Sequence, residues 1–353
     1  MSSSVGAYRP PRRTALLIGI NYRGTENELN GCYNDVVNVS QYLRSVLGYA
    51  PGAISVLTDG NRGSAFPASV APTRQNILAG MAALVAGMVA GDEAVFHYSG
   101  HGTLVRDTNG DEATGLDSCL CPLDYNAPAS TGGGVVTDDE IRALLVNKVP
   151  RGARLYLILD CCHNGTGCDV RYKYEDFSIL LRPPSARTAP LWRTQQKAFA
   201  DGKYTETAGE VFMISGCRDE QTSADAYINN AFAGALTYAV FAILRANQAS
   251  IRTYSWSSLL RDVRHFMRVN RYSQIPQLMT GQLISPARAV FAVAGAARSA
   301  SSVLELSSGA IGVGGAGARG VSASDAPATL FSFSVKPKSG SNPTPRHCIQ
   351  FLV

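Results

Sequence analysis

The chain has 353 residues, of which 45% are hydrophobic and 17% are charged, and its formal net charge is +5. This length suits one large α/β domain or two small ones, and the apolar content is ample for a buried core. The Lys and Arg residues do not form dense blocks interleaved with aromatic residues, so we do not expect a nucleic-acid surface.

The N-terminal residues and the cysteines indicate in which cellular compartment the protein is expected. Residues 2–11 are polar, so no secretory signal is predicted and we expect a cytoplasmic protein. In a reducing compartment the eight cysteines are expected to be free thiols, and their spacing matches no structural zinc site. The longest apolar stretches have about 14 residues, whereas a membrane span needs about 20, so no span is expected.

Strand-like and helical patterns alternate along the chain. The strand-like runs are mostly continuous apolar segments, which is typical of strands covered on both faces. In chain order we predict a strand at 14–20, a helix at 34–47, a strand at 54–58, a helix at 73–90, strands at 94–98, 154–159, 211–215 and 277–280, and helices at 138–147, 232–246 and 255–269. This order predicts a three-layer α/β fold with a mostly parallel central sheet flanked by helices.

Two short strings directly follow predicted buried strands, and ligands of such sheets bind at the carboxyl ends of the strands. The first string contains His101 and the second contains the doublet Cys161-Cys162. An imidazole can deprotonate a thiol and later protonate a leaving amine, which is the chemistry of a cysteine peptidase. The backbone N–H groups of Gly102 and Cys162 would form an oxyanion hole. The alternative is a buried structural cysteine with an unrelated histidine, and the spacing alone does not choose between the two cysteines.

Two further acids bear on the substrate. Asp160 lies two residues before Cys162, and Asp35 lies at the start of a predicted helix whose N-terminus would meet the same strand ends. Two carboxylates in one pocket favour a cationic side chain, and a guanidinium can pair with them in bidentate fashion. The alternative for Asp35 is an acid stabilised by the dipole of its own helix.

The remaining acids cluster in the sequence. Several loops would together offer hard oxygen ligands of the kind that Ca²⁺ prefers, although no EF-hand spacing is present. The alternatives are a solvated turn at 107–112 and a helix N-terminus at 138–139. The acids are Asp107, Asp111, Glu112, Asp117, Asp138, Asp139 and Asp169.

These motifs together resemble those of the type I metacaspases, the caspase-related cysteine peptidases of protists, fungi and plants, and the protist and kinetoplastid members in particular. The similarity runs from about residue 14 to residue 280. Its motifs are Gly19-Ile20-Asn21-Tyr22, Leu29-Asn30-Gly31-Cys32-Tyr33-Asn34-Asp35, Tyr98-Ser99-Gly100-His101-Gly102, Asp138-Asp139-Glu140, Asp160-Cys161-Cys162-His163-Asn164-Gly165, Ser215-Gly216-Cys217 and Gln221-Thr222-Ser223-Ala224-Asp225.

The resemblance implies a caspase-like (caspase–hemoglobinase) fold, His101 as the base and Cys162 as the nucleophile. It implies monomeric enzymes that cleave protein substrates after Arg or Lys, with Ca²⁺ as an activator that takes no part in the chemistry. The implied S1 pocket consists of Cys32, Asp35, Ser99 and Asp160. The implied calcium ligands are Asp117, Asp138, Asp139 and Asp169.

The expected organisation is a short N-terminal arm (1–13), a peptidase domain (14–290) and a low-complexity flexible tail (291–353). Within the domain we expect a first part at 14–170, a basic loop at 171–209 that is a candidate for self-cleavage, and a second part at 210–290. The arm is shorter than the extensions that can cover the cleft in related enzymes. The alternatives in function are a caspase-like peptidase of different specificity and a non-catalytic regulatory protein.

Overall fold

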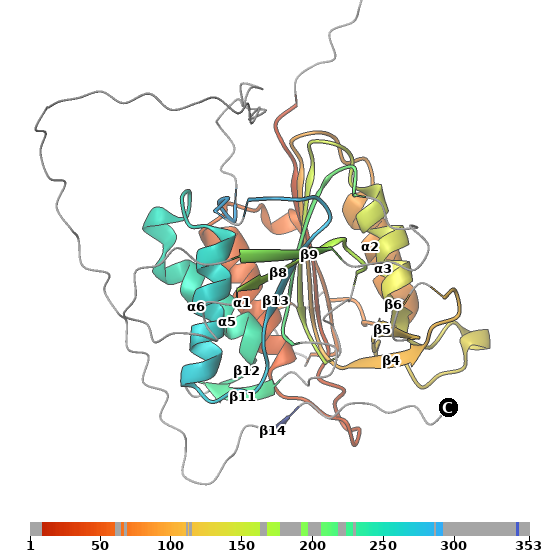
Figure 1. Ribbon diagram of the computed structural model, residues 1–353. Helices are drawn as coiled ribbons and strands as arrows, with labels where there is room; N and C mark the ends of the chain where they lie inside the picture. Colours follow the sequence, from red (N-terminus) through yellow and green to blue (C-terminus); the bar gives the residue numbers. More distant parts are fainter. Residues whose placement is uncertain are drawn as a thin grey trace, which may run out of the picture.

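An eight-stranded sheet forms the centre of the molecule in the computed structural model (Figure 1). The structure describes residues 9–60, 65–66, 69–110, 112, 115–162, 168–176, 192–196, 206–217, 224–228, 231–285, 287–291 and 344–345. The strand order is β2-β1-β3-β7-β10-β13-β8-β9. The first five strands are parallel, and the last three are antiparallel to their neighbours. Their bounds are β2 Ile54–Thr58, β1 Arg13–Gly19, β3 Glu93–Ser99, β7 Arg154–Asp160, β10 Glu210–Ser215, β13 Gln277–Thr280, β8 Tyr172–Asp176 and β9 Trp192–Gln196.

Helices cover both faces of this sheet, and the fold therefore has three layers (Figure 1). On one face lie α1 (Cys32–Ser45), α5 (Ala235–Ala246) and α6 (Trp256–Val269), and on the other lie α2 (Arg74–Val85) and α3 (Asp138–Leu144). Successive residues of a strand point to opposite faces. Leu16 and Ile18 of β1 pack with α2, whereas Leu17 packs with α1. Because both faces are buried, the strand sequences are continuous apolar runs.

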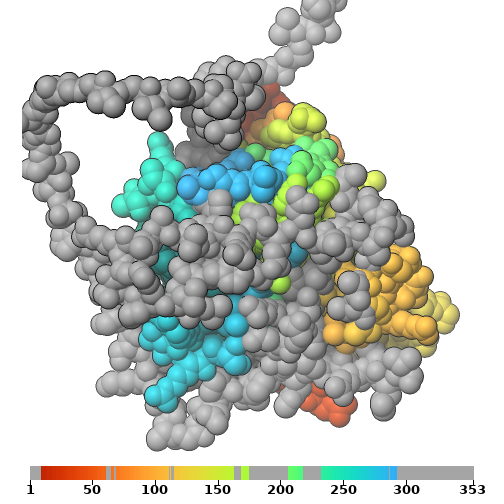
Figure 2. Space-filling view, viewed as in Figure 1, coloured from red at the N-terminus to blue at the C-terminus, as the bar shows by residue number. Residues whose placement is uncertain are grey.

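Two small sheets lie near the end of the molecule at which the parallel strands finish (Figure 1). One consists of β4 (Gly102–Arg106), β5 (Leu116–Leu120) and β6 (Val136–Thr137), and the other of β12 (Ala231–Gly234), β11 (Ala224–Ile228) and β14 (Thr344–Pro345). In the space-filling view, α6 (cyan) and the orange region around β4 flank the visible face on opposite sides (Figure 2). The motif at 98–102 leads directly into β4, and the motif at 138–140 directly follows β6.

The three-layer fold with a mostly parallel sheet is confirmed. The six predicted strands are β1, β2, β3, β7, β10 and β13, and the five predicted helices are also present. Helix α2 ends at Val85 rather than residue 90, because Gly87 follows with a φ of 65° and Gly91 with a φ of 93°.

The region predicted as a basic loop contributes two strands, β8 and β9, to the antiparallel side of the central sheet. Tyr172 and Tyr174 of β8 are buried while Lys173 between them is less so, an alternation too short to stand out in the sequence. Residues 177–191 and 197–205 of that region, residues 1–8 of the arm and most of the tail lie outside the described residues. Of the described tail residues, Phe291 is buried, and Thr344 and Pro345 pair with β11.

In the described part of the chain, every helix is too short or too polar to cross a bilayer. The seven cysteines that the structure describes are buried free thiols.

Candidate active site

The carboxyl ends of β3 and β7 bring the two sequence motifs together. These strands are parallel neighbours, and their register sets Ser99 opposite Asp160. Just beyond the strands, the Gly100 N–H donates to the Asp160 carbonyl at 3.5 Å. His101 and Cys162 therefore leave the sheet at the same edge, and both are buried.

Gly102 packs directly against the backbone of Cys162. A Cβ at position 102 would collide with the carbonyl oxygen of Cys162 and would also crowd the carbonyl of Cys119. Only glycine lets two backbones approach this closely. The predicted base and nucleophile thus belong to segments that touch through their main chains, and the predicted oxyanion-hole residues Gly102 and Cys162 lie at the same contact.

A backbone carbonyl orients the His101 imidazole. Nε2 of His101 lies 2.8 Å from the carbonyl oxygen of Asn27, which can only accept a hydrogen bond. Nε2 therefore carries the proton in the neutral ring, and Nδ1 holds the lone pair. Asn27 lies in the loop between β1 and α1, and no feature of the sequence pointed to it, since a main-chain oxygen has no residue signature.

The predicted S1 acids meet at the same sheet edge. Asp35 lies in the first turn of α1 and accepts a hydrogen bond from Ser99 Oγ at 2.6 Å. Both Asp35 and Asp160 are fully buried. The fourth predicted residue, Cys32, is buried at the first position of α1, where its carbonyl packs against Gly19 at the end of β1.

Both carboxylates also contact the N-terminus of α5. The Gly234 N–H lies 3.0 Å from each carboxylate oxygen of Asp35, and the Thr237 N–H donates to Asp160 Oδ2 at 2.8 Å. The first N–H groups of a helix have no partner within the helix and attract negative charge. The alternative considered for Asp35 was stabilisation by the dipole of its own helix, and the structure adds a second helix terminus to its environment.

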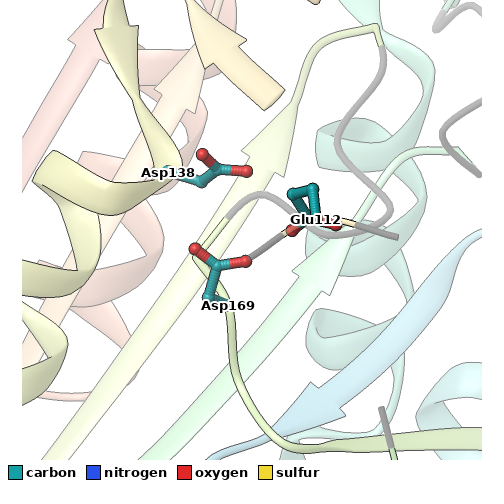
Figure 3. Close-up of side chains that lie close together, drawn as sticks. All are labelled: Glu112, Asp138 and Asp169. Atoms are coloured by element: carbon teal, nitrogen blue, oxygen red, sulfur yellow. The ribbon is translucent and has the colours of Figure 1, made fainter. Parts of the chain in front are cut away.

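A second group of acids lies around the start of α3. Ligand oxygens of Glu112, Asp138 and Asp169 lie within 4.8 Å of one another, and the three carboxylates point toward a common centre (Figure 3). Asp138 and Asp169 belong to the predicted calcium set. Glu112 appeared in the acidic cluster of the sequence but not in that set, because it reaches the others only through the turn that joins β4 and β5.

That turn is built by Asp107. Its carboxylate accepts hydrogen bonds from the N–H groups of Asn109, Gly110 and Glu112, an arrangement typical of Asp-led turns. Asp139, another predicted ligand, is half-buried and accepts a hydrogen bond from Asn109 Nδ2 at 2.6 Å. It is not one of the three grouped carboxylates.

The electrostatics of this group centre on Asp138. Burial and the negative charge of Asp169 raise the pKa of Asp138 to about 9, with smaller contributions from Asp117 and Glu112. The Ser118 N–H donates to Asp138 Oδ2 at 2.9 Å and opposes this shift. Several buried carboxylates that repel one another in this way fit a hard divalent cation, which takes oxygen ligands in flexible geometry.

Comparisons with known proteins agree with these motifs. The family described as "Metacaspase, peptidase C14 domain" matches residues 13–171. Metacaspase-1 of Pyricularia oryzae is 37% identical over 295 residues, which cover 76% of this chain and 71% of that protein. The chain belongs to the metacaspase family of cysteine-type peptidases. Metacaspase-1 of Yarrowia lipolytica is 36% identical, and the chain spans 61% of its length.

The fold comparison is consistent with the metacaspase assignment. A crystal structure of a Geobacter sulfurreducens protein matches with a TM-score of 0.53 and 24% identity, covering 81% of this chain and all of that one. Family membership makes the three-layer architecture the caspase-like fold expected from the sequence. Within this metacaspase, the predicted base, the predicted nucleophile and the predicted S1 acids come from one sheet edge, while the acids around α3 form a separate group.

The contact at Gly102 leads to a prediction. Gly102→Ala should lower the melting temperature by several degrees and slow alkylation of Cys162, because the added methyl must push the two strand ends apart. Differential scanning fluorimetry and mass spectrometry of the alkylated peptide measure both effects. Gly52→Ala is the matched control, since a Cβ there meets nothing within 4 Å. Equal behaviour of the two variants would contradict the prediction.

Proposed function

We propose that the chain is a calcium-dependent cysteine endopeptidase that cleaves peptide bonds after Arg or Lys, with Cys162 as nucleophile and His101 as base. The main support is the contact of the two strand ends, where the His101-Gly102 segment packs on the backbone of Cys162. Membership of a cysteine-peptidase family adds to it.

The proposed reaction follows from the orientation of His101. With Nε2–H held by the Asn27 carbonyl, Nδ1 accepts the thiol proton of Cys162 as sulfur attacks the peptide carbonyl carbon. The N–H groups of Gly102 and Cys162 stabilise the oxyanion. His101 then gives the proton to the leaving amine, the C–N bond breaks, and water hydrolyses the thioester to regenerate the thiol.

The nucleophile can be tested with its neighbour as the control. We expect Cys162→Ala to abolish hydrolysis of a fluorogenic peptide that ends in Arg, whereas Cys161→Ala keeps it, because the Cys161 side chain packs in the core. Peptides ending in Lys, Asp and Asn complete the assay. Cleavage after Asp or Asn alone would indicate a peptidase of different specificity, and a folded wild-type protein that cleaves none would indicate a regulatory protein.

The proposed preference for Arg or Lys depends on two buried acids, Asp35 and Asp160, which lie near Ser99 at one edge of the sheet. The N–H groups of Gly234 and Thr237 donate to these carboxylates and hold them in place. A guanidinium offers five N–H donors in one plane and pairs with carboxylates in bidentate fashion. Asp35 and Asp160 would then hold the α5 terminus and the substrate side chain together, with Cys32 and Ser99 completing the S1 pocket.

We therefore expect Asp160→Asn to reduce kcat/KM for an Arg-ending peptide by roughly a hundredfold, since a charge-assisted pair becomes a neutral hydrogen bond. Alkylation of Cys162 by uncharged iodoacetamide should change far less. The amide oxygen can still accept the Thr237 N–H, so the α5 contact is kept. If the substitution lowered kcat/KM and the rate of alkylation by the same factor, Asp160 would stabilise the fold and would not determine the specificity.

We further propose that Ca²⁺ binds to Asp117, Asp138 and Asp169, joined by Glu112, and that Asp139 supports the ion from the edge of the group. The clustered oxygens and the raised pKa of Asp138 support a cation there. Asp169 follows Cys162 by seven residues in the sequence. A bound ion would therefore tie the chain after the nucleophile to α3 and would open the active site, without joining the chemistry.

Calcium binding has a direct readout. Added Ca²⁺ should raise the melting temperature of the wild-type protein by several degrees, because a ligand that binds only the native state stabilises it. Asp138→Asn should remove most of this shift and the calcium dependence of hydrolysis. Asp262→Asn on α6 is the control that also loses one carboxylate. The proposal would be refuted if calcium changed neither the melting temperature nor the hydrolysis rate of the wild-type protein.

Four further elements of the proposed function concern the whole protein. We propose that it acts as a monomer in the cytoplasm on protein substrates, and that it cleaves itself within 171–203. The support for self-cleavage is the density of basic residues in that stretch, since each is a site for a peptidase of this specificity. They are Arg171, Lys173, Arg182, Arg187, Arg193, Lys197 and Lys203.

A further inference from the structure

Two buried phenols lie beneath the turn that carries His101. Tyr22 follows β1, and Tyr98 is the penultimate residue of β3. Both are almost completely inaccessible to solvent, and their hydroxyl oxygens are 3.1 Å apart. The reaction proposed above assigns no task to either side chain.

Tyr22 contacts His101 in two ways. Its hydroxyl accepts a hydrogen bond from the His101 backbone N–H at 2.9 Å and donates one to the Cys121 carbonyl at 2.6 Å. Its ring lies against the imidazole, with centroids 4.7 Å apart and planes inclined by 41°. One side chain thus holds both the main chain and the ring face of the proposed base.

Tyr98 holds the other side of the same residue. Its hydroxyl lies 2.8 Å from the His101 carbonyl and 2.9 Å from the Cys121 carbonyl, and the Cys121 N–H donates to the His101 carbonyl at 3.1 Å. Each hydroxyl has one proton, so together the two phenols can donate one hydrogen bond to each of these two carbonyls. Burial raises the pKa of Tyr22 and of Tyr98 well above the ordinary value, so both remain protonated donors.

The phenols also explain a glycine of the motif. A Cβ at Gly100 would lie 2.7 Å from the Tyr98 hydroxyl oxygen and 3.0 Å from that of Tyr22. The space that a side chain would need at position 100 is filled by the two hydroxyls. The turn before His101 is therefore shaped around them.

The backbone conformation of Tyr22 is also unusual. Its φ is 51°, a left-handed conformation that is uncommon and strained for a bulky residue. Thr25 fixes this conformation, because its N–H and Oγ1 donate to the Tyr22 carbonyl at 3.2 and 2.7 Å. The fold therefore accepts local strain in order to bring this side chain under His101.

We propose that Tyr22 is a positioning residue that, with Tyr98, fixes the His101 imidazole in the orientation in which Nδ1 receives the Cys162 proton. The inference rests on the proposed function for the roles of His101 and Cys162. A buried tyrosine hydroxyl needs some hydrogen-bond partner, and what distinguishes Tyr22 is that its hydroxyl bonds the main chain of His101 while its ring lies against the imidazole.

The test compares the wild-type full-length chain with Tyr22→Phe in the presence of calcium. The rate at which iodoacetamide alkylates Cys162, followed by peptide mass spectrometry across pH, gives the apparent pKa of the thiol. We expect Tyr22→Phe to raise this pKa and to lower kcat roughly tenfold to a hundredfold with little change in KM, because misplacing a catalytic group slows the chemical step. Melting temperatures verify that the variant is folded.

Tyr42→Phe is the matched control. Tyr42 is a fully buried tyrosine on the opposite face of the sheet, and its hydroxyl has no hydrogen-bond partner among the described residues. It should leave the pH profile unchanged.

Tyr98→Phe provides a second variant if Tyr22→Phe is unstable, and it should shift the pH profile in the same direction. An unchanged profile in a folded variant at position 22, or at position 98 if the first is unstable, would overturn the inference. Failure of the proposed function looks different, since wild-type Cys162 would then react no faster than an ordinary thiol.

Discussion

The parallel register of β3 and β7 is the constraint on which the proposed active site depends. It sets Ser99 opposite Asp160, so that the two chains leave the sheet side by side at one edge. The residues that follow can meet only because Gly102 lets the two backbones touch. A shift of one residue in this register would turn every side chain of one strand to the other face and would separate the proposed base from the nucleophile.

The two acidic groups of the protein are stabilised by different means. Asp35 and Asp160 are buried, but N–H groups at the start of α5 and the Ser99 hydroxyl already donate to them. Such carboxylates are held in place before a substrate arrives, which lowers the entropic cost of binding. Around Asp138 the neighbours are mostly other carboxylates, so its pKa rises to about 9. The first group would suit the guanidinium of the proposed substrate, and the second would suit the proposed divalent cation.

Most of the central sheet could be predicted, because strands that are buried on both faces have continuous apolar sequences. Strands such as β4 and β5 could not, since each has only five residues with mixed polar and apolar side chains and is stabilised by pairing with its neighbour. The same limit applies to the site. Glu112 joins the acids of α3 only through the turn built by Asp107, and Asn27 contributes a main-chain oxygen that any residue would supply.

The sequence by itself determined the fold class, the family, and the candidates His101 and Cys162, because these depend on residue identity and on hydrophobic periodicity. Tertiary structure alone decided which nitrogen of His101 carries the proton and which helix terminus meets the buried acids. It also brought Tyr22 from the end of another strand beneath His101. These features depend on contacts between segments far apart in the chain, and on backbone atoms that are the same in every residue.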